Sequence, residues 1–185
     1  MKFAICDPPY IGCAHLYPEK EEVDHAALIA RLIADYPDGW VLCCHPPSIR
    51  VLLPLCPDDV RIGAWVKPWA VWKNRTGPVY AWESVLWRGG RKYTRQQQQP
   101  RDWVTANALM GQRATGGVPG AKPEAVCFWY FQLLNAAAGD TLDDLYLGSG
   151  NVTRAWTKWQ HRLPFEIGQA ALDGPDATPA LTGRE

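Results

Sequence analysis

Short apolar runs alternate with segments of helical spacing along most of this chain, and the alternation limits the folds it can adopt. Residues 2–6 and 40–44 are almost entirely apolar, which is typical of buried strands. Between them, Asp24 can cap a helix over residues 26–36, where apolar side chains recur every three or four positions. Strands that alternate with helices predict an α/β fold with a mostly parallel sheet.

The same pattern continues up to one long interruption. Further strands are expected over 60–66, 80–87 and 141–146, and further helices over 46–53, 123–138 and 152–160. Residues 89–120 lose the periodicity and include four consecutive glutamines, so we expect one long loop there. From residue 168 onward the chain is rich in Gly, Pro and Ala. We therefore expect one domain over residues 1–165 and a flexible tail over 166–185.

Charge and cysteine usage narrow the classes of function. Lys plus Arg and Asp plus Glu both number 19, so any surface that binds nucleic acid must be local. The six cysteines include no C-x-x-C pair, which favours free thiols in a reducing cytoplasm. Cys43, Cys44 and His45 match no zinc-ligand spacing, and we expect no metal. No apolar stretch reaches the roughly 18 residues that a membrane span needs.

The turn Asp7-Pro8-Pro9-Tyr10 directly follows the first apolar run. Its two prolines fix φ and make the turn stiff. A stiff turn suits the exocyclic amine of adenine, a poor nucleophile, because Asp7 and the Pro8 carbonyl could accept its two N–H hydrogens. Tyr10 could stack on a base taken out of a duplex. These four residues are candidate catalytic residues; the alternative is an ordinary turn, in which Asp and Pro are common.

A second turn, Asp144-Leu145-Tyr146-Leu147-Gly148-Ser149-Gly150, separates the last expected strand from the last expected helix. Its glycines let a ligand approach the backbone, and the N-terminus of the following helix favours acidic groups. In sheets of this kind, ligands bind beyond the carboxyl ends of the strands, where both turns are expected. Gly-Ser-Gly is also common in turns that bind nothing, and that alternative stays open.

Together the two turns resemble those of the amino-methyltransferases of DNA, in the permuted order in which the catalytic motif precedes the cofactor motif. The matching residues are Asp7, Pro8, Pro9 and Tyr10 in the catalytic motif and Asp144, Tyr146, Gly148 and Gly150 in the cofactor motif. Lys122-Pro123 stands where the family has a Lys-Pro pair that opens a helix. Residues 2–156 also resemble short methyltransferase-like proteins of bacteriophages and prophages.

The resemblance implies a Rossmann-like methyltransferase fold with helices on both faces of the sheet, S-adenosyl-L-methionine as cofactor and N6-methyladenine as product. It implies a cofactor site made of Lys122, Pro123, Asp144, Tyr146, Gly148, Ser149 and Gly150. In that site Lys122 and the helix start would hold the methionine carboxylate of the cofactor.

The chain departs from the family after the cofactor turn. The family normally continues to a strand whose acidic residue binds the ribose hydroxyls, and here Glu166 is the nearest candidate. We therefore expect a fold shortened after the cofactor-binding strand. Its pocket would be open on one side or completed by a second subunit in a homodimer.

One basic cluster falls in the interval of the expected loop. It consists of Arg88, Arg91, Lys92, Arg95 and Arg101, and no acidic residue lies among them. In the family, the target-recognition segment occupies the same interval, and contact with DNA phosphates is the natural role. The alternative is a solvated loop whose charges serve solubility.

Three functions remain open. The first is methylation of adenine N6 in DNA, in the cytoplasm of a bacterial host cell. The second is the same chemistry on RNA or another amine, and the third is a catalytically idle nucleic-acid-binding module. The intact Asp7–Tyr10 turn favours an enzyme, whereas the short carboxyl end favours the idle module. Glu83, among apolar neighbours, is expected as a pocket wall or a buried partner for an arginine, without a catalytic role.

Overall fold

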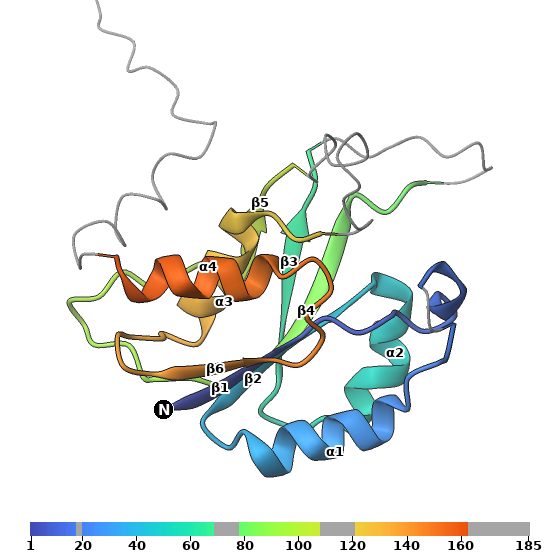
Figure 1. Ribbon diagram of the computed structural model, residues 1–185, viewed down its shortest axis with the longest axis horizontal. Helices are drawn as coiled ribbons and strands as arrows, with labels where there is room; N and C mark the ends of the chain where they lie inside the picture. The colour runs from blue at the N-terminus through green and yellow to red at the C-terminus, as the bar shows by residue number, and fades with distance from the viewer. Residues whose placement is uncertain (18–19, 69–77, 108–120, 163–185) are drawn as a thin grey trace, which may run out of the picture.

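A six-stranded sheet forms the centre of the molecule, and helices cover both of its faces (Figure 1). The computed structural model describes residues 1–17, 20–68, 78–107 and 121–162. The strands lie in the order β5-β3-β4-β2-β1-β6. They span Lys2–Cys6 (β1), Gly39–Cys44 (β2), Arg61–Val66 (β3), Trp82–Gly89 (β4), Trp103–Thr105 (β5) and Thr141–Asp144 (β6). Within the described residues, β5 and β6 are therefore the outer strands.

Strand β4 runs opposite to the other five described strands. β1 pairs in parallel with β2 and β6, and β3 pairs in parallel with β5. β4 pairs antiparallel with both β2 and β3. The five parallel strands thus finish together at the carboxyl end of the sheet and begin together at its amino end. Because β4 is reversed, it begins at the carboxyl end with Trp82 and finishes at the amino end with Gly89, opposite Gly39.

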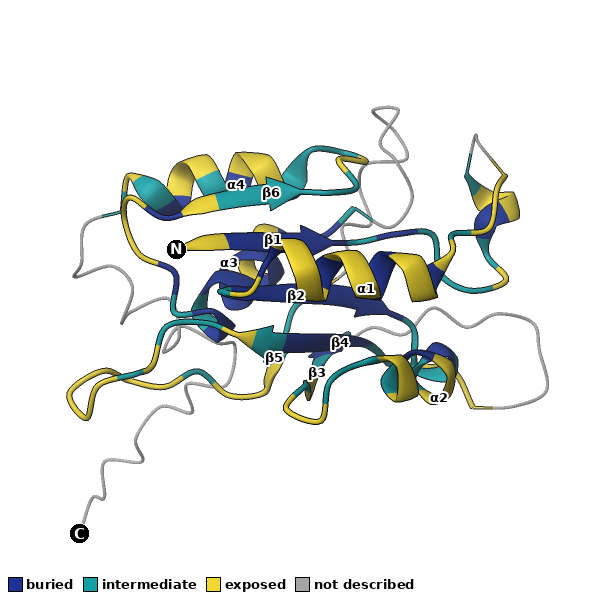
Figure 2. Ribbon diagram, turned by 90° about the horizontal axis from the view of Figure 1, so that it is seen from below, coloured by how far each residue is buried: buried dark blue, intermediate teal, exposed yellow. Residues whose placement is uncertain are grey.

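Two layers of helices enclose the sheet (Figures 1 and 2). The α-helices are α1 (His25–Asp35), α2 (Ile49–Leu52), α3 (Glu124–Leu133) and α4 (Asn151–Gln160), with short 3-10 turns at Ala14–Leu16, Pro46–Ser48 and Leu53–Leu55. Phe3 and Ile5 of β1 pack on the side of α3 and α4, whereas Ala4 and Cys6 pack on the side of α1 and α2. This alternation is the period of two that a strand buried on both faces requires.

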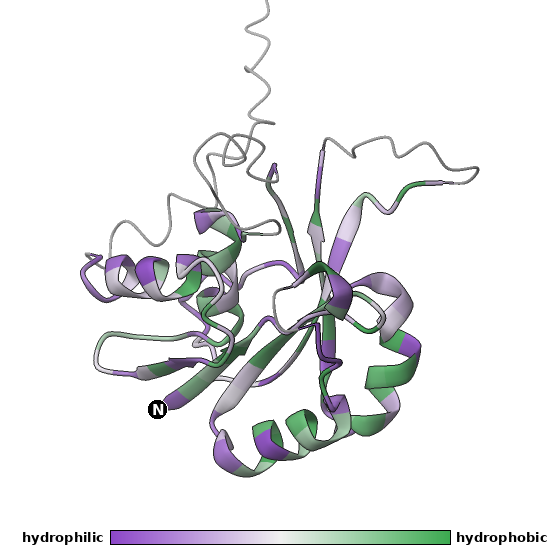
Figure 3. Cartoon of the chain, turned by 45° about the vertical axis from the view of Figure 1, so that its right-hand side comes forward, coloured by the Kyte–Doolittle hydropathy of each residue, from purple (hydrophilic) through white to green (hydrophobic). Residues whose placement is uncertain are grey.

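The central strands carry the apolar core. All six residues of β2 are buried, and green dominates the middle of the sheet in the hydropathy view (Figure 3). The Asp24 carboxylate caps α1 as expected, because it accepts a hydrogen bond from the N–H of Ala27 at 3.0 Å. No helix in the described part of the chain is long and apolar enough to cross a membrane.

The expected α/β fold, with a mostly parallel sheet and helices on both faces, is confirmed, but some boundaries were wrong. The expected loop over 89–120 contains β5, three residues too short to show a period of their own. The helix expected to reach residue 138 ends at Leu133, and Asn135 follows in the left-handed region at φ 46°. The strand expected to reach residue 146 ends at Asp144. Residues 108–120, the tail over 166–185 and the ribose candidate Glu166 lie outside the described residues.

Candidate active site

The turn Asp7-Pro8-Pro9-Tyr10 leaves the carboxyl end of β1, between the ends of β2 and β6. Pro8 is buried and the other three residues are half-buried. The Tyr10 carbonyl accepts a hydrogen bond from the N–H of Cys13 at 2.8 Å, so the chain turns back directly after the motif. The Asp7 side chain keeps 24% of its surface exposed, which leaves its carboxylate within reach of a ligand.

A buried lysine is bound to that carboxylate. Lys122 is 6% exposed, and its ammonium donates to Oδ1 and Oδ2 of Asp7 at 2.8 and 2.7 Å. It also lies 3.3 Å from the Tyr10 hydroxyl and 3.6 Å from Oε2 of Glu83. Burial alone would lower the pKa of Lys122, but the negative charges of Asp7 and Glu83 outweigh it and raise that pKa. The ammonium therefore stays charged.

Glu83, the second residue of β4, binds the same cluster from the other side. Its Oε2 accepts a hydrogen bond from the Tyr10 hydroxyl at 2.7 Å, and its Oε1 forms an ion pair with Lys67. Burial would raise the pKa of Glu83, but Lys122 and Lys67 lower it below its usual value, so this carboxylate is ionised. Its cationic partners are lysines rather than the expected arginine. In the sequence, a carboxylate among apolar residues of a strand indicates a buried ion pair, because a buried charge is costly unless it is paired.

The ring of Tyr10 is also fixed from one side. The imidazole of His45, the residue after β2, stacks on it with ring centroids 5.4 Å apart and an interplanar angle of 2°. Nδ1 of His45 lies 2.7 Å from the Ser48 hydroxyl, which holds the imidazole in place. Burial lowers the pKa of His45, so the neutral imidazole is favoured at neutral pH. His45 thus covers one face of the Tyr10 ring, while Tyr10 also packs against the core on the side of α3.

The glycine turn lies beside the Asp7 turn because β6 pairs with β1. Asp144 is opposite Ile5, and the N–H of Leu145 donates to the Ile5 carbonyl at 3.0 Å. Gly148 and Gly150 have φ of 45° and 70°, a region that favours glycine, and Gly150 is the residue before α4. The two turns that the sequence singled out therefore meet at the carboxyl end of the sheet.

The residues that flank the glycine turn form hydrogen bonds that link this turn to α4 and to Lys122. The Asp144 carboxylate accepts a hydrogen bond from Oγ1 of Thr153 in α4 at 2.9 Å, and burial raises its pKa. Nδ2 of Asn151 donates to the Lys122 carbonyl at 2.9 Å, so the first residue of α4 touches the lysine that binds Asp7. Pro123 precedes the first residue of α3. Tyr146 is half-buried and packs on the side of α1. Ser149, between the two glycines, is half-buried.

The basic cluster lies at the other end of the sheet. Arg88 is five residues along β4 from Glu83, which corresponds to about 17 Å of extended strand. Nε of Arg88 pairs with Asp59 at 2.6 Å, and the guanidinium of Arg91 pairs with Asp140 at 2.8 and 2.9 Å. A cavity of about 500 Å³ opens there, lined by Arg88, Arg91 and Lys92 among others.

Arg95 and Arg101 are exposed on the same segment between β4 and β5. The fold therefore does not bring the predicted DNA-binding residues to the Asp7 turn.

Metal ligation was not expected, and the described side chains contain no group of three or more His, Cys, Asp or Glu that could hold an ion. All six cysteines are free thiols. Cys43 and Cys44 are buried inside β2, where Sγ of Cys43 donates to the Tyr130 hydroxyl at 3.3 Å and Cys44 contacts Ser84. They serve the core rather than the site.

Comparison with known proteins relates the fold, and only the fold, to a solved structure. No protein-family model and no curated protein matches the sequence. The chain is similar to M1.HpyAVI in its complex with SAM, with a TM-score of 0.58 and 18% sequence identity over 92% of this chain and 87% of that one. A second structure of M1.HpyAVI gives a TM-score of 0.55 and 17% identity over 92% of this chain and 84% of the other. The chain therefore has the Rossmann-like fold of methyltransferases.

Proposed function

We propose that this protein is a methyltransferase that uses S-adenosyl-L-methionine to methylate the N6 amine of adenine in DNA. The observation that carries the proposal is the meeting of the Asp7-Pro8-Pro9-Tyr10 turn with the glycine turn at the carboxyl end of the sheet. In open α/β sheets, ligands bind beyond this end. One turn offers acceptors for an amine, and the other offers backbone that a cofactor can approach.

The adenine would be bound through its exocyclic amine. Asp7 and the Pro8 carbonyl accept the two N–H hydrogens and hold the nitrogen lone pair toward the incoming methyl group, so the turn acts chiefly by positioning. The base would contact the ring of Tyr10, which His45 holds from one face. Lys122 occupies both Asp7 oxygens, so it must share or release one of them when the amine binds.

The cofactor would lie over the turn of Asp144, Tyr146, Gly148, Ser149 and Gly150. M1.HpyAVI was solved with SAM, which supports this cofactor for the shared fold. When bound, the cofactor would supply the methyl group and leave as a neutral thioether, and the amine would release one proton to water. Lys122 and Pro123 lie close enough to the Asp7 turn for the lysine to serve both the methionine carboxylate and Asp7 in turn.

Several finer expectations stay predictions. They are the choice of DNA over RNA, the bacterial cytoplasm, the homodimer, the likeness to phage proteins and the phosphate contacts of the basic cluster. An idle binding module is the alternative, and a single transfer assay separates it from an enzyme.

The test is methyl transfer from labelled cofactor to adenine-containing DNA, with RNA of the same sequence alongside and N6-methyladenine identified by mass spectrometry. We expect transfer to DNA and a fall in rate of the order of 10²–10⁴-fold in Asp7→Asn, which loses the carboxylate but keeps its shape. Asp35→Asn is the matched control, because Asp35 forms an exposed ion pair with Arg31 in α1. Cofactor binding without transfer to any nucleic acid would contradict the proposal, and transfer to RNA alone would change the substrate.

A further inference from the structure

Four charged side chains are joined by ion pairs beside the Tyr10 hydroxyl, and the reaction proposed above uses only part of this cluster. In order of contact these are Asp7, Lys122, Glu83 and Lys67. They come from the turn after β1, the residue before Pro123, the start of β4 and the end of β3. Glu83, like Lys122, touches three of the other groups, because it contacts Tyr10, Lys122 and Lys67.

We propose that Glu83 is a positioning residue for methyl transfer, which fixes Tyr10 and Lys122 beside Asp7 and balances the charge of the two lysines. This inference rests on the proposed function. Glu83 does not touch the reacting atoms in this arrangement; it acts through the groups that do.

The Glu83 carboxylate can position both Tyr10 and Lys122, because it contacts both of them. Oε2 holds the Tyr10 hydroxyl at 2.7 Å, while His45 covers one face of the same ring. These two contacts limit the rotation and the tilt of the Tyr10 ring before a base binds. The same Oε2 lies 3.6 Å from Nζ of Lys122, on the side away from Asp7. Reacting groups misplaced by 1 Å can lose about 100-fold in rate, so a residue that fixes two of them matters.

Glu83 also balances the positive charge of the two lysines, which matters for the transfer of a charged methyl group. The charges of the four groups sum to zero, and their side chains are between 6% and 24% exposed. Methyl transfer moves positive charge from the cofactor sulfur to the adenine nitrogen, which Asp7 would hold, so positive charge comes closer to this cluster in the transition state. Removing the charge of Glu83 leaves a net positive cluster next to that charge, in a region where water screens poorly. Glu83 would therefore lower the barrier by keeping the cluster neutral.

Two variants separate positioning from charge. Glu83→Gln keeps an oxygen that can accept from Tyr10 but leaves the cluster with one excess positive charge. In Lys67→Met/Glu83→Gln the excess charge is removed again, because Lys67 is neutralised as well. Both are assayed for kcat and KM with DNA and with S-adenosyl-L-methionine, and Asp35→Asn is again the control.

We expect Glu83→Gln to lower kcat about 100-fold and the double variant to recover about tenfold of that loss. A kcat of Glu83→Gln within threefold of wild type overturns the inference while the proposed function stands. A double variant no faster than Glu83→Gln overturns the charge balance. A wild type that transfers no methyl group overturns the proposed function itself. If Glu83→Gln does not fold, the charge-balanced double variant carries the same comparison with wild type.

Discussion

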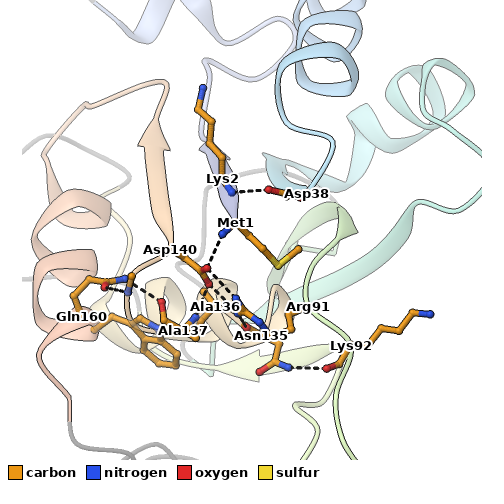
Figure 4. Close-up of polar contacts among 12 residues, drawn as sticks. Met1, Lys2, Asp38, Arg91, Lys92, Asn135, Ala136, Ala137, Asp140 and Gln160 are labelled. Carbon is orange, nitrogen blue, oxygen red and sulfur yellow. Dashed lines mark hydrogen bonds and ion pairs between the residues drawn. The ribbon is translucent and has the colours of Figure 1, made fainter.

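Buried ion pairs stand at both ends of the sheet, and the two sets differ in what they leave open. At the amino end, Asp140 is bound by the guanidinium of Arg91 at 2.8 and 2.9 Å and by the Met1 ammonium at 2.8 Å (Figure 4). The N–H of Ala137 donates to it at 2.8 Å, and Arg91 also donates to the Asn135 carbonyl. Asp140 thus joins the start of β1, the segment after β4 and the segment before β6.

Exposure separates the two clusters. Both oxygens of the central carboxylate are bound in each cluster, but the Asp140 side chain is 4% exposed, whereas the Asp7 side chain is 24% exposed and borders two turns. Burial of charge is therefore common to both ends and marks neither as an active site. An accessible carboxylate beside glycine-rich backbone marks the carboxyl end, while the sealed carboxylate at the amino end holds strands together.

The variant Asp140→Asn tests the division of roles between the two ends of the sheet. We expect it to lower the free energy of unfolding by about 2–3 kcal/mol, because Arg91 and the Met1 ammonium lose their common anion but stay partly exposed to water. Denaturant unfolding measures the loss, and kcat of the folded protein should change by less than a factor of three. A large fall in kcat without a loss of stability would contradict the division between the two ends.

The contribution of Asp140 to stability depends on pH. Burial would raise the pKa of Asp140, but hydrogen bonds from Arg91 and Met1 hold it well below its usual range. A carboxyl whose folded pKa is lowered contributes stability above its unfolded pKa of about 3.9 and loses that contribution as pH falls toward the folded value. The stability difference between wild type and Asp140→Asn should therefore be full at pH 7 and shrink below pH 4. A difference that stays constant down to pH 2 would show that the charge is not its cause.

A smaller effect is expected from Gly150→Ala, which tests the glycine turn. Gly150 has φ 70°, and an added Cβ would lie 3.1 Å from Nη1 of Arg154, a mobile group. Backbone strain of about 1–2 kcal/mol should shift the turn and weaken cofactor binding by about tenfold in calorimetry. Gly139→Ala is the matched control, since Gly139 has φ 84°, nothing within 4 Å of its added Cβ, and a place at the amino end. Equal cofactor affinities in the two variants would exclude the glycine turn as the cofactor site.

Much of this arrangement could be predicted from the sequence, for a physical reason. The strands at 2–6 and 141–144 belong to an alternation of strands and helices, which predicts parallel strands, and the turns that follow parallel strands lie at one end of the sheet. The reversal of β4 could not be predicted from periodicity, because a strand buried on both faces looks the same in either direction. That one reversal brings Glu83 to the site and carries Arg88 away from it. The partner of Lys122 was also out of reach, since Asp7 lies 115 residues away and only the folded sheet joins them.

The smallest effect is expected from Lys92→Ala, which tests whether DNA reaches the amino end. Lys92 is exposed on the segment after β4, beyond Arg88 on the side away from Asp7. If a duplex lies over the carboxyl end only, its affinity should fall by less than twofold, and the dependence of binding on salt should not change. Loss of one phosphate contact would instead reduce the slope of the logarithm of the binding constant against the logarithm of the salt concentration by about 1. Lys158→Ala is the control, because Lys158 is an exposed lysine of α4 that pairs with Glu124. A lower salt slope in Lys92→Ala alone would mean that the duplex extends around the sheet to its amino end, and the basic cluster would then contact phosphates, as the sequence suggests.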